Sequence, residues 1–197
     1  MKIFAFTDVH EHPKAMKIVQ QRVREFKPDI VVCCGDLTIF EHSLGRMMKW
    51  LSGLHKEVII IPGNHETVRG LKKYCKGNVK CLHQNSAMYD DLMFVGWGGG
   101  GFSLVEPEFE RFTKQINSTM QGKRVVLITH APPYGTKLDF LGKNWGHVGC
   151  KSITKFLKTH KVLLALSGHI HETFGKKDRV GGAVVCNPGP LGLVIEV

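Results

Sequence analysis

Short runs of apolar residues recur along the whole chain and alternate with amphipathic stretches. The runs are rich in valine and isoleucine and have the length of β-strands. They read KIFAFT, DIVVCC, EVIIIP, LMFVGW, RVVLIT, VLLALS, AVVC and GLVIEV. Apolar residues at helical spacing predict helices between them, over residues 13–26, 43–54, 66–76, 106–118 and 147–160. This alternation predicts an α/β fold with parallel strand pairs, and the short strands near the carboxyl end indicate a second sheet layered on the first.

The size and composition are those of an ordinary globular protein. The chain has 197 residues, of which 43% are hydrophobic and 22% are charged, and no change of composition marks a domain boundary. We therefore expect a single domain over residues 1–197. The apolar stretch at the amino terminus is too short for a signal peptide, and no apolar run approaches the length of a membrane span. These features predict a soluble cytoplasmic protein with no membrane partner.

The charge and the cysteines narrow the choice of partners. The formal net charge is +10, but the lysines and arginines are scattered, with no basic run of five or more. A basic surface attracts phosphate, so nucleic acid remains compatible with the charge, although solvated faces and a small anionic substrate are favoured. The six cysteines form no C-x-x-C pair, which argues against a zinc knuckle or a redox motif. Free thiols in a reducing compartment are expected.

Polar residues with metal-binding side chains follow five of the predicted strands. The strands end in TDVH, CGD, PGNHE, THAPP and SGHIH. In open α/β sheets the carboxyl ends of the strands converge on one crevice, so these side chains are predicted to gather there. They are Asp8, His10, Asp36, Asn64, His65, His130, His169 and His171.

The chemistry of this set indicates divalent metals. It contains two carboxylates, one amide and several imidazoles, with no thiolate. Oxygen and nitrogen donors favour Mn, Fe, Co, Ni or Zn over copper(I) or an iron–sulfur cluster, and the imidazoles disfavour Mg or Ca alone. There are more candidate ligands than one tetrahedral zinc needs, so two metals about 3.5–4 Å apart with a bridging carboxylate would use them. Such a pocket carries net positive charge and attracts phosphate esters.

These residues resemble the calcineurin-like metallophosphoesterases. That family's pattern D-x-H, G-D, G-N-H-[D/E], H and G-H-x-H is present in order from Asp8 to His171, and the closing NPGPLG is similar to the small single-domain members described as phosphodiesterases. The resemblance implies a four-layer α-β-β-α sandwich of two mixed sheets flanked by helices. It also implies two divalent metal ions and attack on the phosphorus by a metal-bound hydroxide.

The resemblance assigns a role to each motif residue. Asp8, His10 and His171 would bind one metal, and Asn64, His130 and His169 would bind the other. Asp36 would bridge the two ions. His65 would remain unligated and would either stabilise the phosphate or protonate the departing oxygen, so Asp36 and His65 are the expected catalytic residues.

Three further residues are candidate substrate contacts. His12 follows the first motif and would either touch the substrate phosphate or lie on the surface. Tyr134, in APPYGT, would stack on a base or cover the core, and His147, expected at the start of a helix, would line the pocket or cap that helix. For the first motif, the alternation of side chains along a strand predicts that Asp8 and His10 point the same way.

The expected function is hydrolysis of small phosphodiesters, with several alternatives left open. A protein phosphatase or other phosphomonoesterase would share the metal ligands, but the V-D-R-G that follows Gly-Asp in the protein phosphatases is replaced here by Leu37, Thr38 and Ile39. The positive charge is compatible with a nuclease, but the chain lacks the capping and dimer extensions of repair nucleases. A metal-binding scaffold without turnover is disfavoured by the complete ligand set. The native metal, the substrate and the oligomeric state stay open, a homodimer included.

Overall fold

Two β-sheets face each other at the centre of the protein. The computed structural model describes residues 1–197. The first sheet has the strand order β11-β1-β2-β3-β4, in which β1 to β4 are parallel and β11 is antiparallel. Its strands are β1 (Lys2–Phe6), β2 (Ile30–Cys33), β3 (Val58–Ile60), β4 (Val79–Cys81) and β11 (Leu193–Glu196).

The second sheet has six strands in the order β5-β6-β7-β8-β10-β9. Its four inner strands are parallel, and each edge strand is antiparallel to its neighbour, so this sheet is also mixed. The strands are β5 (Asn85–Tyr89), β6 (Leu92–Trp97), β7 (Arg124–Thr129), β8 (Val162–Leu166), β9 (Lys177–Val180) and β10 (Ala183–Cys186).

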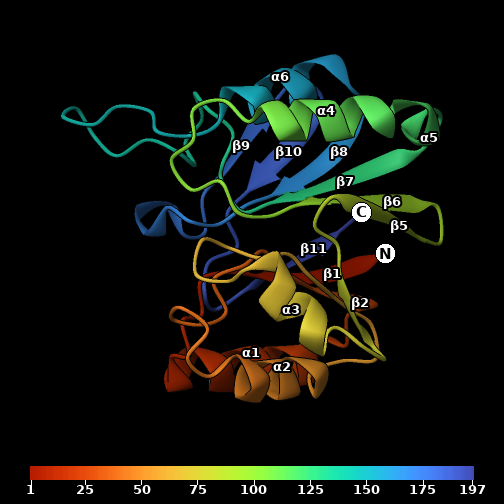
Figure 1. Ribbon diagram of the computed structural model, residues 1–197, viewed down its shortest axis with the longest axis vertical. Helices are drawn as coiled ribbons and strands as arrows, with labels where there is room; N and C mark the ends of the chain where they lie inside the picture. The colour runs from red at the N-terminus through yellow and green to blue at the C-terminus, as the bar shows by residue number, and fades with distance from the viewer.

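Helices cover the outer face of each sheet (Figure 1). The first sheet is covered by α1 (Pro13–Phe26), α2 (Leu44–Ser52) and α3 (Val68–Tyr74). The second is covered by α4 (Pro107–Gln115), α5 (Asn117–Met120) and α6 (Lys151–Thr159), and a 3-10 turn spans His171–Thr173. The layers therefore run helix, sheet, sheet, helix, which confirms the predicted four-layer sandwich. No helix is long and apolar enough to cross a lipid bilayer.

The period-two pattern of the strands builds the core in three layers. In β1, Ile3 and Ala5 belong to the cluster between the two sheets, whereas Phe4 and Phe6 belong to the cluster under α1 and α2. Successive side chains of a strand point to opposite faces, so one buried strand contributes to two apolar layers. A third cluster packs the second sheet against α4 and α6. The sheets are thus covered on both faces, as parallel sheets require.

Three strands and two helices differ from the sequence-based expectation. The single helix expected over residues 106–118 is divided into α4 and α5, with Ile116 between them. The strands β4, β5 and β9 were not predicted, because they lie at or next to sheet edges, are partly exposed and lack a continuous apolar run. The last long helix, α6, begins at Lys151 rather than at residue 147, with Cys150 as its N-cap. His147 therefore lies in the loop before the helix and does not cap it.

Candidate metal centre

The predicted ligands lie in the loops that follow β1, β2, β3, β7 and β8. These strands run parallel within their own sheets, and their loops gather on the side of the molecule opposite the two chain ends (Figure 1). Backbone hydrogen bonds join the loops: Asp8 N donates to the Gly35 carbonyl at 3.1 Å, and Gly168 N donates to the His130 carbonyl at 2.9 Å. Each of these bonds joins loops of one sheet, and His169 N, after β8, donates to Asp8 Oδ2, after β1, at 3.0 Å. Segments from both sheets thus meet at one place.

The backbone at Asp8 and His10 corrects the expected reason for their pairing. Strand β1 ends at Phe6, and both residues have left-handed backbones, with φ of 53° for Asp8 and 45° for His10. Strand alternation therefore does not align them. The same conformation occurs at Asp36 (φ 51°) and His169 (φ 68°). Non-glycine residues with positive φ are uncommon and often mark functional sites.

The side chains form three overlapping groups of metal donors. Within each group the donor atoms lie within 4.8 Å of one another. The groups are Asp8, His10 and His171; His10, Asp36 and His65; and Asp36, His130 and His169. Asp36 and His10 each belong to two groups. The first group is the ligand set that the resemblance implies for one metal. The third group contains Asp36 and two of the three ligands implied for the other metal, His130 and His169.

Distances to Asp36 and Asp8 describe the centre more closely. The Oδ2 atom of Asp36 lies 3.4 Å from His130 Nε2 and 3.7 Å from His10 Nε2. The Oδ1 atom of Asp8 lies 3.5 Å from His171 Nε2 and 3.9 Å from His10 Nε2. Asp36 therefore stands between the two sides of the cluster, in the position that a bridging carboxylate needs.

Asn64 completes the side that contains His130 and His169. Its Oδ1 atom lies 3.0 Å from His130 Nε2 and 2.9 Å from His169 Nδ1. An amide oxygen and two imidazole nitrogens therefore face a common point. In the same cluster, the buried His169 Nε2 and His65 Nδ1 atoms have no hydrogen-bond partner. A set of oxygen and nitrogen donors with unpartnered imidazole nitrogens fits divalent metal ions.

Two backbone carbonyls set the orientation of the imidazoles. His10 Nδ1 donates to the Thr38 carbonyl at 3.1 Å, and His130 Nδ1 donates to the Cys34 carbonyl at 2.9 Å. In both rings this leaves Nε2 directed at the carboxylates. Metal-ligating histidines are commonly held in this way, because the outer hydrogen bond selects the tautomer and fixes the ring.

Charge coupling shifts the pKa values of the buried pair Asp36 and His130. Burial raises the pKa of Asp36, but the hydrogen bond and charge of His130 outweigh it and bring the value to about 2. Burial lowers the pKa of His130, but the interaction with Asp36 raises it to about 9. Burial and the nearby His130 lower the pKa of His169 to about 4. In the metal-free protein, therefore, a proton on His130 balances the Asp36 carboxylate.

Glu66 supports the centre although it is not one of the predicted ligands. Its side chain is only 6% exposed and accepts four hydrogen bonds. Oε2 accepts from the backbone N–H groups of Asp36 and Gly63, both at 3.0 Å, and Oε1 accepts from the N–H and hydroxyl of Thr38 at 2.7 and 2.8 Å. Glu66 thus ties the Asp36 loop to the Asn64 loop. The only sequence signal for it was the last letter of GNHE.

The close approach of these loops also explains the glycine at position 63. A Cβ atom on Gly63 would overlap the carboxylate and backbone nitrogen of Asp36. Likewise, a Cβ atom on Gly168 would overlap Thr7 and the carboxylate of Asp8. The glycines of the motifs G-N-H and G-H-x-H are therefore required by close contacts between loops.

The predicted catalytic histidine, His65, lies at the edge of the cluster. Its Nε2 atom is 4.0 Å from Asp36 Oδ2, and its backbone N–H donates to Asp36 Oδ1 at 3.0 Å. Its ring packs against the ring of His10, with centroids 4.8 Å apart. The side chain of His65 is 20% exposed.

The three candidate substrate contacts occupy different surroundings. His12 is exposed and caps α1, where its Nδ1 accepts from Ala15 N at 3.4 Å. Tyr134 and His147 lie together in the loop that precedes α6, with ring centroids 5.6 Å apart. His147 Nδ1 contacts the buried carboxylate of Asp139 at 2.8 Å. None of the three contacts a predicted ligand, so a role in substrate binding stays a prediction.

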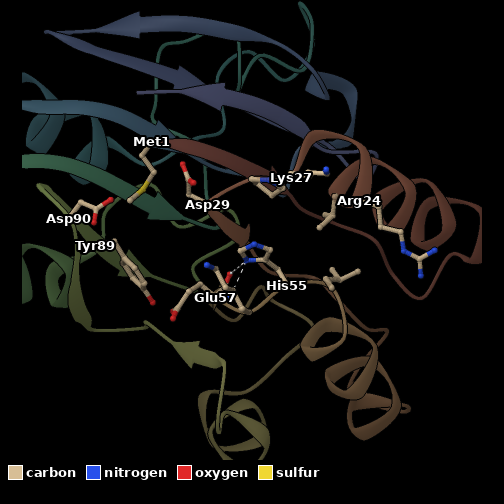
Figure 2. Close-up of a pocket in the computed structure, with 12 residues that line it drawn as sticks. Met1, Arg24, Lys27, Asp29, His55, Glu57, Tyr89 and Asp90 are labelled. Atoms are coloured by element: carbon tan, nitrogen blue, oxygen red, sulfur yellow. Dashed lines mark hydrogen bonds between the residues drawn. The ribbon is translucent and has the colours of Figure 1, made fainter.

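A separate cavity of about 700 Å³ lies at the amino ends of the strands, away from the metal donors. Figure 2 shows Met1, Asp29, Glu57 and Tyr89 around it. These residues precede β1, β2 and β3 or close the β5–β6 turn, whereas the metal donors follow the strands. The cavity contains none of the predicted ligands and is not part of the candidate centre.

Comparisons with known proteins find relatives over nearly the whole chain. A family model described as calcineurin-like phosphoesterase matches residues 1–173. The uncharacterized protein MJ1162 of Methanocaldococcus jannaschii is 32% identical over 203 residues, which cover 96% of this chain and 88% of that protein.

Solved structures share the fold at low sequence identity. TT1561 of Thermus thermophilus has a TM-score of 0.78 and 17% identity, with 96% of this chain and 89% of that chain covered. A dimetal phosphatase from Danio rerio, LOC 393393, has a TM-score of 0.66 and 15% identity, with 97% of this chain and 88% of that chain covered.

Proposed function

This chain belongs to the calcineurin-like phosphoesterases, and from that premise we propose that it hydrolyses small phosphodiesters at a centre of two divalent metal ions. The observation that carries the proposal is the position of Asp36, whose carboxylate is shared between two groups of donors. A carboxylate so placed can bridge two ions. The Danio rerio protein of the same fold, described as a dimetal phosphatase, is consistent with this arrangement.

The proposed ligand sets follow the geometry of the cluster. Asp8, His10 and His171 would hold one ion, Asn64, His130 and His169 would hold the other, and Asp36 would be common to both. Ions such as Mn, Fe, Ni, Co or Zn would supply Lewis acidity toward the phosphate and a water acidic enough to serve as nucleophile. The protein contributes the fixed orientation of the imidazoles through the Thr38 and Cys34 carbonyls.

His65 is proposed as the residue that handles the proton of the leaving group. Its backbone is anchored to Asp36, and its ring lies beside the donors, so it can reach the ester oxygen of a phosphate bound there. Donation of a proton from its imidazole to the departing alkoxide would prevent the build-up of negative charge on that oxygen. The proton returns from solvent after the product leaves.

A diester is favoured over a monoester because of the charges around the centre. The ion pairs of the cluster join carboxylates to imidazoles only, and no lysine or arginine takes part in them. Leu37 and Thr38, which follow Asp36, are buried, and Thr38 is bound to Glu66. This segment therefore offers no arginine to hold the second charge of a monoester dianion.

The test compares esters and metal states directly. The kcat/KM for bis(p-nitrophenyl) phosphate should exceed that for p-nitrophenyl phosphate and for a DNA oligonucleotide under one metal and one salt. Chelator-treated protein should lose activity and recover it with Mn(II) or Ni(II). Asp36→Asn should lose both metal content and turnover, whereas Asp91→Asn, an exposed carboxylate paired with Arg124, should retain both. A tenfold preference for the monoester or the oligonucleotide would contradict the diesterase proposal.

The proposal extends to organisation and location. The whole chain, residues 1–197, is taken as one metallophosphoesterase domain, because both sheets contribute loops to the same centre. All six cysteines are free thiols, which is consistent with a reducing compartment such as the cytoplasm. A small phosphate ester is the proposed partner.

A further inference from the structure

Two exposed phenylalanines lie against the histidines of the metal centre. The side chain of Phe40 is 67% exposed, and its ring centroid is 4.3 Å from that of His65. The side chain of Phe102 is 64% exposed, and its ring centroid is 4.5 Å from that of His169. Single exposed apolar side chains are common on protein surfaces, but both of these border the same catalytic cluster.

The backbone at Phe40 holds the ring outward at an energetic cost. Phe40 has φ of 49° and Glu41 has φ of 62°, a left-handed conformation that bulky residues rarely adopt. Burial of the ring does not compensate for this strain. The segment is nevertheless fixed, because Glu41 Oε1 accepts from the N–H and hydroxyl of Thr67 at 2.6 and 2.8 Å. Strain that is maintained at an exposed aromatic residue points to a functional use.

The glycine-rich segment WGGGG positions the second ring. Gly99, Gly100 and Gly101 all have positive φ, and Phe102 follows them directly. Gly99 N donates to the Pro62 carbonyl at 2.9 Å, just before the loop that carries Asn64 and His65. The segment is therefore a turn that sets Phe102 beside His169.

We propose that Phe40 and Phe102 are stacking platforms for planar aromatic groups on the substrate, so that the preferred esters are phosphodiesters carrying a nucleobase or a comparable ring. This inference rests on the proposed function. A diester bound at the centre has two arms, and each phenylalanine borders a different donor group: Phe40 through His65, and Phe102 through His169. Aromatic rings gain from stacking with one another, whereas a bare sugar phosphate would leave both phenylalanines in water.

Further exposed apolar residues lie close to each phenylalanine in the sequence. Ile39 precedes Phe40, while Leu104 and Val105 follow Phe102, and all three are exposed. Phe40 and Phe102 are thus specificity-determining residues of the proposed reaction.

The test uses two substrates with the same reacting bonds. Adenosine 2′,3′-cyclic phosphate carries a base, and methyl riboside 2′,3′-cyclic phosphate does not. Because this nucleotide carries one base, the alanine substitution at the platform that holds the base, Phe40→Ala or Phe102→Ala, should lower its kcat/KM by about 5- to 100-fold, the usual range for a lost base-stacking contact. Both substitutions should leave the methyl riboside nearly unchanged. The loss should appear mainly in KM. Phe40→Trp should retain the preference, and Phe26→Ala, an exposed phenylalanine at the end of α1, should behave as wild type.

A binding measurement separates this inference from the proposed function. Calorimetric titration of the metal-loaded protein with adenosine 5′-monophosphate and with ribose 5-phosphate requires no turnover. If at least one of the two alanine variants binds the nucleotide more weakly and binds ribose 5-phosphate as wild type does, the platform at that position is supported even if no diester is hydrolysed. Equal losses for both ligands, no loss for either, or a change only in self-association would overturn the inference.

Discussion

Glu66 offers the sharpest test of how the centre is built. Its buried carboxylate accepts two hydrogen bonds at Oε2, from Asp36 N and Gly63 N, and two at Oε1, from the N–H and hydroxyl of Thr38. Glu66→Gln keeps the size of the side chain but replaces one acceptor atom by an NH₂ group. The substitution therefore places donors against donors on one side of the carboxyl group.

The two orientations of the glutamine amide set the magnitude. With its oxygen toward Asp36 and Gly63, the NH₂ group can donate to the Thr38 hydroxyl, and only the Thr38 N–H is left unpaired. The opposite orientation leaves two backbone N–H groups unpaired. A buried unpaired donor costs about 1–3 kcal/mol, and a hydrogen bond to a charged acceptor is worth about 1.5–3 kcal/mol. We expect the free energy of unfolding to fall by about 2–4 kcal/mol.

Glu66→Gln should also lower the affinity for metal ions, because Glu66 positions the backbone of Asp36. Substitution of a residue that hydrogen-bonds to a metal ligand typically lowers metal affinity by about 10- to 100-fold. Urea unfolding in excess chelator would measure the change in stability without the metal contribution, and competition with a chromophoric chelator would measure the affinity. Glu108→Gln, at an exposed carboxylate on α4, is the matched control and should change stability by less than about 0.5 kcal/mol. An unchanged urea midpoint and unchanged affinity in Glu66→Gln would refute the assigned role.

Two further predictions follow from the cluster. His65→Ala should retain metal but slow turnover by about 100- to 10,000-fold, with a smaller deficit for nitrophenolate than for alkoxide leaving groups; equal deficits in a kcat comparison would instead assign His65 to orienting the phosphate. In the metal-free protein, the raised pKa of His130, about 9 against 6.5, contributes stability that is complete below pH 6.5 and is lost as pH rises through 9. The lowered pKa of Asp36, about 2 against 3.8, contributes stability that is present above pH 3.8 and is lost as pH falls through 2. The lowered pKa of His169, about 4 against 6.5, contributes stability that is present above pH 6.5 and is lost as pH falls through 4. Chelator-treated protein should therefore be most stable near pH 6.5, and a urea midpoint that keeps rising toward pH 9 would contradict this coupling.

Local patterns in the sequence were sufficient for most of the fold. The β-branched runs predicted the buried strands, because a strand covered on both faces needs a continuous apolar sequence. The helix expected over residues 13–26 coincides with α1. Strands β4, β5 and β9 escaped detection because their pairing comes from neighbouring strands rather than from an apolar run of their own.

The metal centre was predictable for a related reason. Parallel strands that alternate with helices bring their carboxyl ends to one edge, so a polar residue at a strand end is placed by topology alone. Asp36 and His130, 94 positions apart by their residue numbers, could therefore be assigned to one cluster before any contact was known.

Only the tertiary structure could decide the contacts between loops. Glu66 acts on Asp36 and Thr38 through backbone N–H groups, which every residue type except proline provides, so no side-chain pattern announces the pairing. Phe40 and Phe102 belong to no motif, and their proximity to His65 and His169 depends on left-handed turns. The chain thus encodes its strands, helices and ligands locally, while the orientation of those ligands arises from hydrogen bonds and packing between segments that meet only in the folded state.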